Sequence, residues 1–214
     1  MPEARPTVFV VDDDASVRSV LESLIQFAGW EARTFASAQE FLGCPRASGP
    51  SCLVLDVHLP DLNGLDLQAS IASDRTDMPI IFITGYADVA MTVRAMKAGA
   101  VEFLTKPFRG DVLVDAIGGA IERSRAVAGE QAAVQALRDR QASLSRRERE
   151  VMTLVVSGLL NKQVARELGI SEITVKAHRG KLMRKMKAGS ICDLVRMATR
   201  LDFGLRAHQG GGSS

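Results

Sequence analysis

Five short runs that predict strands, four of them mainly apolar, constrain the fold of the first half of this chain more than any other feature of the sequence. They cover residues 8–11, 32–35, 52–55, 79–84 and 101–104. Between them, apolar residues recur at helical spacing, and Ser37-Ala38-Gln39-Glu40 has the sequence of a capping box at the start of one helix. Strands that alternate with helices predict a parallel α/β sheet with right-handed crossovers and helices on both faces.

Chemically useful residues follow four of these runs. Asp12 and Asp13 come directly after the first run, Asp56 closes the third, Thr84 closes the fourth, and Lys106 follows the fifth. The carboxyl ends of parallel strands meet at one edge of a sheet, and ligands bind outside that edge. We therefore expect these five side chains to converge on one site.

The chemistry of such a site is specific. Carboxylates at hydrogen-bonding distance repel each other by a few kcal/mol per pair at an effective dielectric near 20. They either take up protons or bind a hard cation, and oxygen ligands without Cys or His favour Mg²⁺. Mg²⁺ would neutralise an incoming phosphoryl group, leaving Asp56 as the nucleophile, with a positive charge from Lys106 and a hydrogen bond from Thr84. Each residue alone fits a surface or loop position, and it is the ordered set that favours phosphoryl transfer to the protein.

Four strings carry a resemblance to a known family: Val-Val-Asp-Asp-Asp at 10–14, Leu-Asp-Val-His-Leu-Pro-x-x-x-Gly at 55–64, Ile-Thr-Gly at 83–85 and Phe-Leu-Thr-Lys-Pro-Phe at 103–108. On these strings, residues 7–125 resemble the receiver domain of two-component response regulators. The resemblance implies a flavodoxin-like (βα)₅ fold and phosphorylation of Asp56 by a sensor histidine kinase.

The same resemblance assigns further roles. Mg²⁺ would be held by Asp13, Asp56 and the backbone carbonyl of His58, with Asp12 acting mainly through water. Thr84 and Phe103 match the switch pair of the family, although Phe103 also fits plain core packing. The Lys106–Pro107 peptide is usually cis in such receivers.

One enzyme class with a similar nucleophile is disfavoured. Phosphatases of the haloacid dehalogenase type also use an aspartate at a strand end, but they need a second acid two residues later. That position holds His58, whose side chain we expect to face solvent. We therefore expect a regulatory protein and not an enzyme.

The charge of the chain is divided unevenly. Residues 1–121 hold 16 acidic and 9 basic residues, whereas residues 144–200 hold 13 basic and 5 acidic ones. A basic second half joined to an acidic first half predicts a nucleic-acid binder fused to a regulatory or metal-binding module. Between them, residues 122–143 have few apolar positions and predict an exposed helical connector. The expected domains are thus 1–121, the linker 122–143, 144–201 and a flexible tail at 202–214.

The second half has an all-helical pattern. Ser145-Arg146-Arg147-Glu148 is a capping box, Asn161 is expected to cap a short helix that ends at Leu168, and a second helix follows the turn at 169–171. Two helices around a short turn with a glycine predict a helix-turn-helix, whose second helix enters the major groove of DNA. The cations on its exposed face, Lys185 among them, fit phosphate neutralisation, although a solvated basic face is the plain alternative.

Residues 143–200 resemble the LuxR-type four-helix DNA-binding domain. The matching strings are Leu-Ser-x-Arg-Glu-x-Glu-Val, Asn-Lys-Gln-Val-Ala and Ile-Ser-x-x-Thr-Val-Lys-x-His. By this match Lys176 and Ala177 face base edges with Arg179 near them, and the residues at phosphates are Asn161, Lys162, Thr174 and Arg184. The two halves together resemble the FixJ subfamily, with the NarL group next.

The combined hypothesis is a transcription factor. We expect it in the cytoplasm, because residues 1–7 lack the apolar core of a signal peptide and no run is long enough to span a membrane. Phosphorylation of Asp56 would promote homodimerisation, DNA binding and, as the better expectation, activation. Candidates for the dimer face are among Met91, Val93, Ala95 and Met96, although some of these residues must belong to the core. Double-stranded DNA, the kinase and RNA polymerase are the expected partners. The alternative is a DNA-binding protein whose receiver dimerises independently of phosphorylation.

Overall fold

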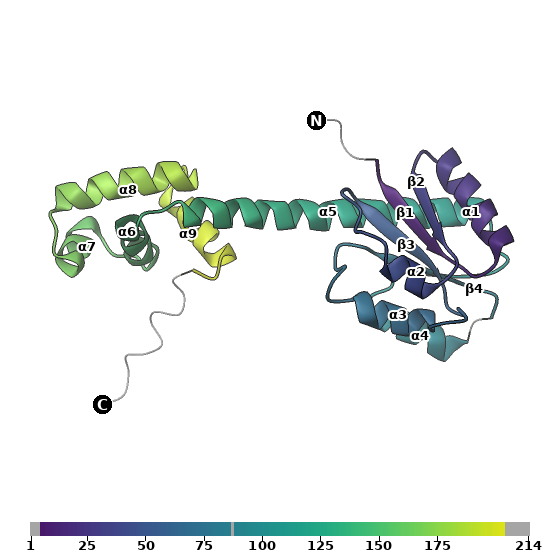
Figure 1. The fold of residues 1–214 in the computed structure, drawn as a ribbon. Helices are drawn as coiled ribbons and strands as arrows, with labels where there is room; N and C mark the ends of the chain where they lie inside the picture. Colours follow the sequence, from purple (N-terminus) through teal and green to yellow (C-terminus); the bar gives the residue numbers. More distant parts are fainter. Residues whose placement is uncertain (1–4, 87, 204–214) are drawn as a thin grey trace, which may run out of the picture. The chain divides into compact units, whose positions relative to one another are not determined.

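The computed structural model describes residues 5–86 and 88–203 of the 214-residue chain. It contains two compact units, Met1–Gly129 and Glu130–Ser214 (Figure 1). The predicted tail covers residues 202–214, and residues 204–214 of it lie outside the described residues. Within the described part, none of the helices is both long and apolar enough to cross a lipid bilayer.

The first unit is built on a five-stranded parallel sheet. Its strands are β1 (Thr7–Val11), β2 (Glu31–Phe35), β3 (Ser51–Asp56), β4 (Ile80–Thr84) and β5 (Glu102–Thr105). They lie in the order β2-β1-β3-β4-β5, and every neighbouring pair is parallel. The flavodoxin-like sheet expected from the sequence is therefore confirmed.

Helices cover both faces of this sheet. They are α1 (Ala15–Phe27), α2 (Ala38–Leu42), α3 (Gly64–Ile71), α4 (Val89–Lys97) and α5 (Gly110–Ala142). Consecutive residues of β1 face opposite sides of the sheet and join different hydrophobic cores. Phe9 packs with residues of α2, α3 and α4, whereas Val10 packs with residues of α1 and α5. The three central strands β1, β3 and β4 are buried at every residue, which explains why they are nearly continuous apolar runs, whereas the edge strands β2 and β5 are partly exposed and contain charged residues.

The helix α5 differs from the expected arrangement. The sequence predicted a separate helical connector at 122–143, but in the structure this segment up to Ala142 continues α5 as one helix. The segment has no proline and is rich in Ala, Gln, Arg and Glu, which favour helix. The Ser124 hydroxyl accepts a hydrogen bond from the backbone N–H of Ser51 at 3.0 Å, which ties the middle of α5 to the sheet.

The second unit contains the end of α5 and the helices α6 (Arg146–Val156), α7 (Asn161–Leu168), α8 (Glu172–Met186) and α9 (Ile191–Arg200). Val151, Val164 and Leu182 are fully buried in its core. At Gly169, φ is 64°, the left-handed conformation that the turn between α7 and α8 requires. The expected helix-turn-helix is confirmed.

One predicted helix cap is wrong. Asn161 is the first residue of α7, and the N-cap is Leu160, which makes no side-chain cap hydrogen bond. The backbone N–H of Leu160 is instead satisfied by Gln163, whose side-chain oxygen accepts from it at 2.8 Å. The Asn161 side chain is thereby available for a different contact.

Candidate functional site

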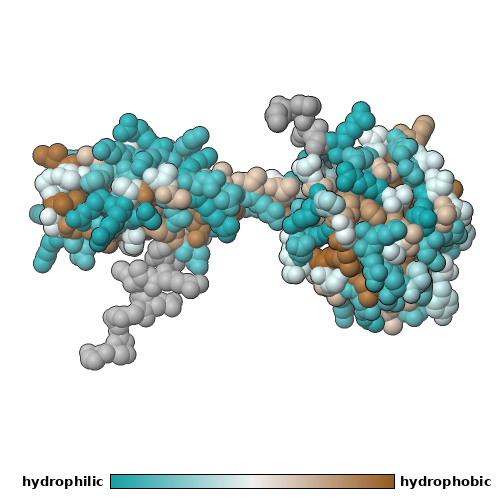
Figure 2. Space-filling model, viewed as in Figure 1, coloured by the Kyte–Doolittle hydropathy of each residue, from teal (hydrophilic) through white to brown (hydrophobic). Residues whose placement is uncertain are grey.

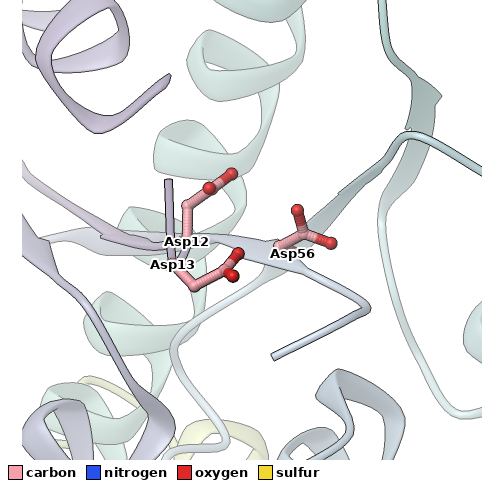
Figure 3. Close-up of side chains that lie close together, drawn as sticks. All are labelled: Asp12, Asp13 and Asp56. Carbon is pink, nitrogen blue, oxygen red and sulfur yellow. The ribbon is translucent and has the colours of Figure 1, made fainter. Parts of the chain in front are cut away.

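The acidic residues of the first unit meet at the carboxyl ends of β1 and β3. These strands are neighbours with Val11 opposite Leu55, so Asp12 and Asp56 emerge side by side. The carboxylate oxygens of Asp12, Asp13 and Asp56 lie within 4.8 Å of one another (Figure 3). Asp12 and Asp56 are buried, whereas Asp13 is exposed, which leaves the cluster open to solvent on one side.

The third aspartate of the Asp12-Asp13-Asp14 run has another role. The carboxylate of Asp14 caps α1, because it accepts hydrogen bonds from Ser16 N at 2.7 Å and Ser16 Oγ at 2.6 Å. The Arg18 guanidinium donates to the backbone carbonyls of Asp12 and Asp13 at 2.7 and 3.0 Å. Helix α1 therefore fixes the backbone that presents the first two acids to the cluster.

Lys106 is the cation of the site. Its Nζ lies 2.7 Å from Asp12 Oδ2 and 2.6 Å from Asp56 Oδ2. The backbone N–H of Lys106 donates to Thr84 O at 2.7 Å, and the Lys106–Pro107 peptide is cis, as the family resemblance implied. The structure thus brings the three acids and Lys106 together as the sequence predicted.

The electrostatics of the cluster remain unbalanced. Burial raises the pKa of Asp12 above its usual value, and the hydrogen bond from Lys106 offsets this only in part. Burial acts to lower the pKa of Lys106, but its hydrogen bonds to Asp12 and Asp56 outweigh burial and raise it. Three carboxylates face one lysine, so the site has an excess of negative charge.

This donor set fits a hard divalent cation. All of its side-chain ligand atoms are carboxylate oxygens, they are close enough to share one ion, and one side is open for entry. The excess of negative charge is what a divalent cation would neutralise. The backbone carbonyl of His58, the fourth expected ligand, stays a prediction.

The predicted switch residues lie on the neighbouring strands β4 and β5. Thr84 is fully buried at the end of β4, and its Oγ1 donates a hydrogen bond to the carbonyl of Tyr86 at 2.8 Å. Phe103 on β5 pairs with Phe82 on β4, with ring centroids 6.0 Å apart, and is partly buried. In this conformation Phe103 packs against the core, so its movement remains a prediction.

The side chain of His58 makes a contact that the sequence did not indicate. We expected it to face solvent, and the residue is indeed exposed, yet its Nδ1 lies 3.2 Å from Thr84 Oγ1. The two residues are 26 positions apart and follow different strands. No local pattern encodes such a contact; only the adjacency of β3 and β4 could have suggested it.

The second unit presents its predicted DNA-binding residues on α8 and at the start of α7. Lys176 and Ala177 are exposed near the N-terminal end of α8. Arg179 Nη1 donates to Asn161 Oδ1 at 2.8 Å, so two predicted DNA contacts bind each other and join the two helices. The face of this unit seen in Figure 2 is mostly hydrophilic.

The other predicted phosphate contacts are two exposed cations and one hydroxyl at the start of α8. Lys162 and Arg184 are exposed. The Thr174 hydroxyl is 2.8 Å from the hydroxyl of Ser171, the N-cap of α8, so it faces the start of that helix. Helix N-termini and nearby hydroxyls suit contacts with phosphate oxygens.

Lys185 has a structural partner that the sequence did not predict. Its Nζ lies 2.7 Å from Glu148 Oε2 and 3.0 Å from Ser143 O. Glu148 is buried and completes the capping box of α6 with Ser145. The hydrogen bond from Lys185, helped by the one from the Ser145 backbone, lowers the pKa of Glu148. Lys185 therefore fastens α8 to α6.

Comparisons with known proteins agree with both parts of the chain. Residues 8–118 match the response regulator receiver domain, and residues 142–198 match the bacterial regulatory proteins of the luxR family. Nodulation protein W of Bradyrhizobium diazoefficiens is 52% identical over 91% of this chain and 86% of its own length. The transcriptional regulatory protein FixJ of the same organism is 42% identical over 90% of this chain and 94% of its own.

A solved structure has the same similarity over its whole length. The response regulator StyR is 44% identical and superposes with a TM-score of 0.83, covering 92% of this chain and 100% of its own.

Proposed function

This chain belongs to the response regulators that join a receiver domain to a LuxR-type DNA-binding domain, and on that premise we propose that phosphorylation of Asp56 controls its binding to DNA. The observation that carries the proposal is the Asp56 carboxylate, held 2.6 Å from Lys106 Nζ within a cluster of three acids. A purely structural module would have no use for this arrangement.

The residues of the chain divide the phosphorylation chemistry among them. A carboxylate oxygen of Asp56 attacks the phosphorus atom, forming an acyl phosphate as the bond from phosphorus to the histidine nitrogen of the donor kinase breaks. His58 N donates to Asp56 Oδ1 at 2.9 Å, and Lys106 holds Oδ2, so the nucleophile is fixed before the donor arrives. Lys106 then remains as a positive charge for the phosphoryl oxygens.

Asp12, Asp13, Asp56 and the carbonyl of His58 would hold Mg²⁺ in this proposal. When bound, the ion supplies positive charge that offsets the repulsion between the cluster and the incoming phosphoryl oxygens. Thr84 contributes a hydroxyl that can donate to the phosphoryl group, and Phe103 is the aromatic partner that follows its movement.

The DNA-binding half acts through α8. We place Lys176 and Ala177 at base edges in the major groove with Arg179 beside them, while the residues assigned to phosphates are Asn161, Lys162, Thr174 and Arg184. The hydrogen bond from Arg179 to Asn161 supports this assignment, because it fixes the orientation of one helix against the other.

Phosphorylation would act on DNA binding through dimerisation of the receiver. Exposed apolar side chains on α4, including Val93 and Met96, support an interface there, whereas Ala95 is fully buried and belongs to the core. Two helix-turn-helix units in a dimer contact half-sites about one helical turn apart, roughly 34–36 Å. Activation of transcription through RNA polymerase is the expected result.

The same proposal includes the domain boundaries and the cellular location of the protein. The receiver is assigned to residues 1–121, the linker to 122–143, the DNA-binding domain to 144–201 and a tail to 202–214. The protein acts in the cytoplasm, where a regulator meets both DNA and its kinase, and it regulates transcription without being an enzyme.

Acetyl phosphate and Mg²⁺ provide a direct test of the phosphorylation site. Intact mass should increase by one phosphoryl group in the wild type and in Asp66→Asn, a control at an exposed acid of α3, but not in Asp56→Asn. Phosphorylation of Asp56→Asn to the same extent as the wild type would contradict the proposal and favour the alternative, a receiver that dimerises without phosphorylation.

A further inference from the structure

The hydroxyl of Thr84 has a complete set of hydrogen bonds in this structure. It donates to Tyr86 O at 2.8 Å, accepts from Tyr86 N at 3.3 Å, and lies 3.2 Å from His58 Nδ1. A hydroxyl has one proton and two lone pairs. Since the proton is directed to Tyr86 O, the imidazole must be the donor in the third contact, so Nδ1 of His58 carries the hydrogen.

We infer that His58 is a positioning residue which, together with the backbone of Tyr86, holds Thr84 in its resting position and so opposes the switch. The regulatory half of this inference rests on the proposed function, because it assumes that the Thr84 hydroxyl moves to a phosphoryl group on Asp56. The contact between His58 and Thr84 does not depend on that assumption.

The Thr84 hydroxyl has a single proton, so it can donate to one acceptor at a time. To donate to a phosphoryl oxygen, Thr84 must release the carbonyl of Tyr86, and it loses the donor of His58 if it moves away. These contacts therefore favour the resting state and are absent from the switched one. A contact present in only one of two states shifts the equilibrium between them by its own free energy.

His58 is also placed to couple the two ends of the switch. Its backbone N–H donates to Asp56 Oδ1, and its ring contacts Thr84 Oγ1, so one residue bridges the nucleophile and the switch hydroxyl. Asp56 pairs with Ile83 across β3 and β4, which brings the loop after β3 to the end of β4. A change at Asp56 therefore reaches the residue that holds Thr84.

The first experiment tests the contact without any phosphoryl analogue. In nitrogen-15 spectra of the full-length protein in alkaline buffer, with the His58 signals assigned by comparison with His58→Asn, we expect a hydrogen-bonded Nδ1–H for His58. That signal should be lost in Thr84→Ala. A His58 ring with hydrogen mainly on Nε2, or with identical spectra in both proteins, would overturn the inference.

The second experiment tests the consequence with two replacements of similar shape. The side-chain NH₂ of Asn can occupy the place of Nδ1, whereas Leu fills similar space without a donor. Followed by the amide signal of Tyr86 at fixed Mg²⁺, the half-saturating concentration of beryllofluoride should fall about fivefold in His58→Leu, the value of one net hydrogen bond of about 1 kcal/mol. His58→Asn, which keeps a donor in that place, should require more beryllofluoride than His58→Leu.

A double-mutant cycle separates a role through Thr84 from a general effect on the loop. In a Thr84→Ala background, His58→Leu should produce no further change, because the partner is already absent. Equal half-saturation in wild type, His58→Leu and His58→Asn, or a full effect of His58→Leu without Thr84, would overturn the inference. A wild type that does not respond to beryllofluoride would overturn the proposed function and the regulatory half of the inference, while the imidazole spectra would still decide the contact.

Discussion

Each unit of the chain contains a lysine that is hydrogen-bonded to buried carboxylates, and these two groups of charged residues differ in their charge balance. Lys106 lies 2.7 and 2.6 Å from Asp12 and Asp56, and Lys185 lies 2.7 Å from Glu148. In the first group one lysine faces several acids, and burial raises the pKa of Asp12. In the second, one lysine faces one acid, and the hydrogen bond between them lowers the pKa of Glu148.

The difference between the groups is one of charge balance. The single negative charge of Glu148 is paired with the single positive charge of Lys185, and the backbone N–H of Ser145 donates to the same carboxylate oxygen, so the charges of this group balance. The Asp56 cluster retains uncompensated negative charge at an edge of the sheet that is open to solvent. A balanced pair holds helices together, whereas an unbalanced cluster has negative charge that suits a divalent cation.

The largest effect on folding should come from removing the lysine of the unbalanced group. In Lys106→Met the buried carboxylates of Asp12 and Asp56 lose their cation, and the free energy of unfolding of the first unit should fall by about 3 kcal/mol. Urea unfolding followed by the fluorescence of Trp30, the single tryptophan, measures it. Mg²⁺ at about 100 times its Kd should restore about 2.7 kcal/mol if it binds only the folded state. An unchanged unfolding midpoint would show that the buried carboxylates do not depend on Lys106 for their stability.

A smaller effect is expected from breaking the balanced pair. Glu148→Ala removes both the ion pair and half of the capping box and should destabilise the second unit by about 2 kcal/mol, whereas Glu148→Gln keeps the box and should cost about 1 kcal/mol. Hydrogen exchange of amides in α6 reports the change. The Trp30 transition of the first unit serves as the control. No loss of stability in Glu148→Gln would show that the charge of Glu148 contributes nothing, and equal losses in the two variants would show that the capping box contributes nothing.

Two lysines of α8 should separate DNA recognition from stability. Lys176→Ala is expected to weaken specific DNA binding about tenfold, or about 1.4 kcal/mol, without changing the thermal stability, because Lys176 is exposed and assigned to base edges. Lys185→Ala is expected to lower the thermal stability, because it leaves the buried carboxylate of Glu148 without its cation. DNA titration and thermal melts of both variants measure this, and loss of stability in Lys176→Ala would contradict the assignment.

The smallest effects concern pH, and here the two groups should differ in sign. The pKa of Glu148 is lowered from 4.5, so its stabilisation is present above that pH and is lost as the pH falls through the folded pKa. The pKa of Asp12 is raised from 3.8, so its ionised form costs stability, and this cost is relieved as the pH falls through its folded pKa. Below pH 5, the destabilisation caused by Glu148→Gln should shrink, and so should the stabilisation caused by Asp12→Asn. Urea unfolding across this range measures both, and changes of the same sign in the two variants would contradict the comparison.

Much of this architecture follows from local sequence. The apolar runs predict the strands, and the residues at their ends predict the cluster, because parallel strands bring their carboxyl ends to one edge. The capping box at Ser145 and the turn at Gly169 predict the helices of the second unit. The strands and helices depend on residues a few positions apart, which sequence patterns record well, and the cluster follows because all the strands run in the same direction.

The contacts that were missed join residues far apart in the chain. His58 meets Thr84 across 26 positions, Arg179 meets Asn161 across 18, and Lys185 meets Glu148 across 37. Each depends on how two elements pack and on which rotamer a long side chain adopts, and neither is set by local periodicity. The continuity of α5 with the connector was missed because the boundary expected at residue 122 rested on sparse apolar positions, although the composition of the segment favours helix throughout.

DNA binding by the wild type and by Asp56→Asn, with and without beryllofluoride and Mg²⁺, tests the central claim most directly. Light scattering on the same samples gives the mass of the protein. We expect a change from monomer to dimer and tighter DNA binding in the wild type alone. Identical mass and DNA affinity in both proteins under all conditions would contradict control by Asp56 and would favour a receiver that dimerises independently of phosphorylation.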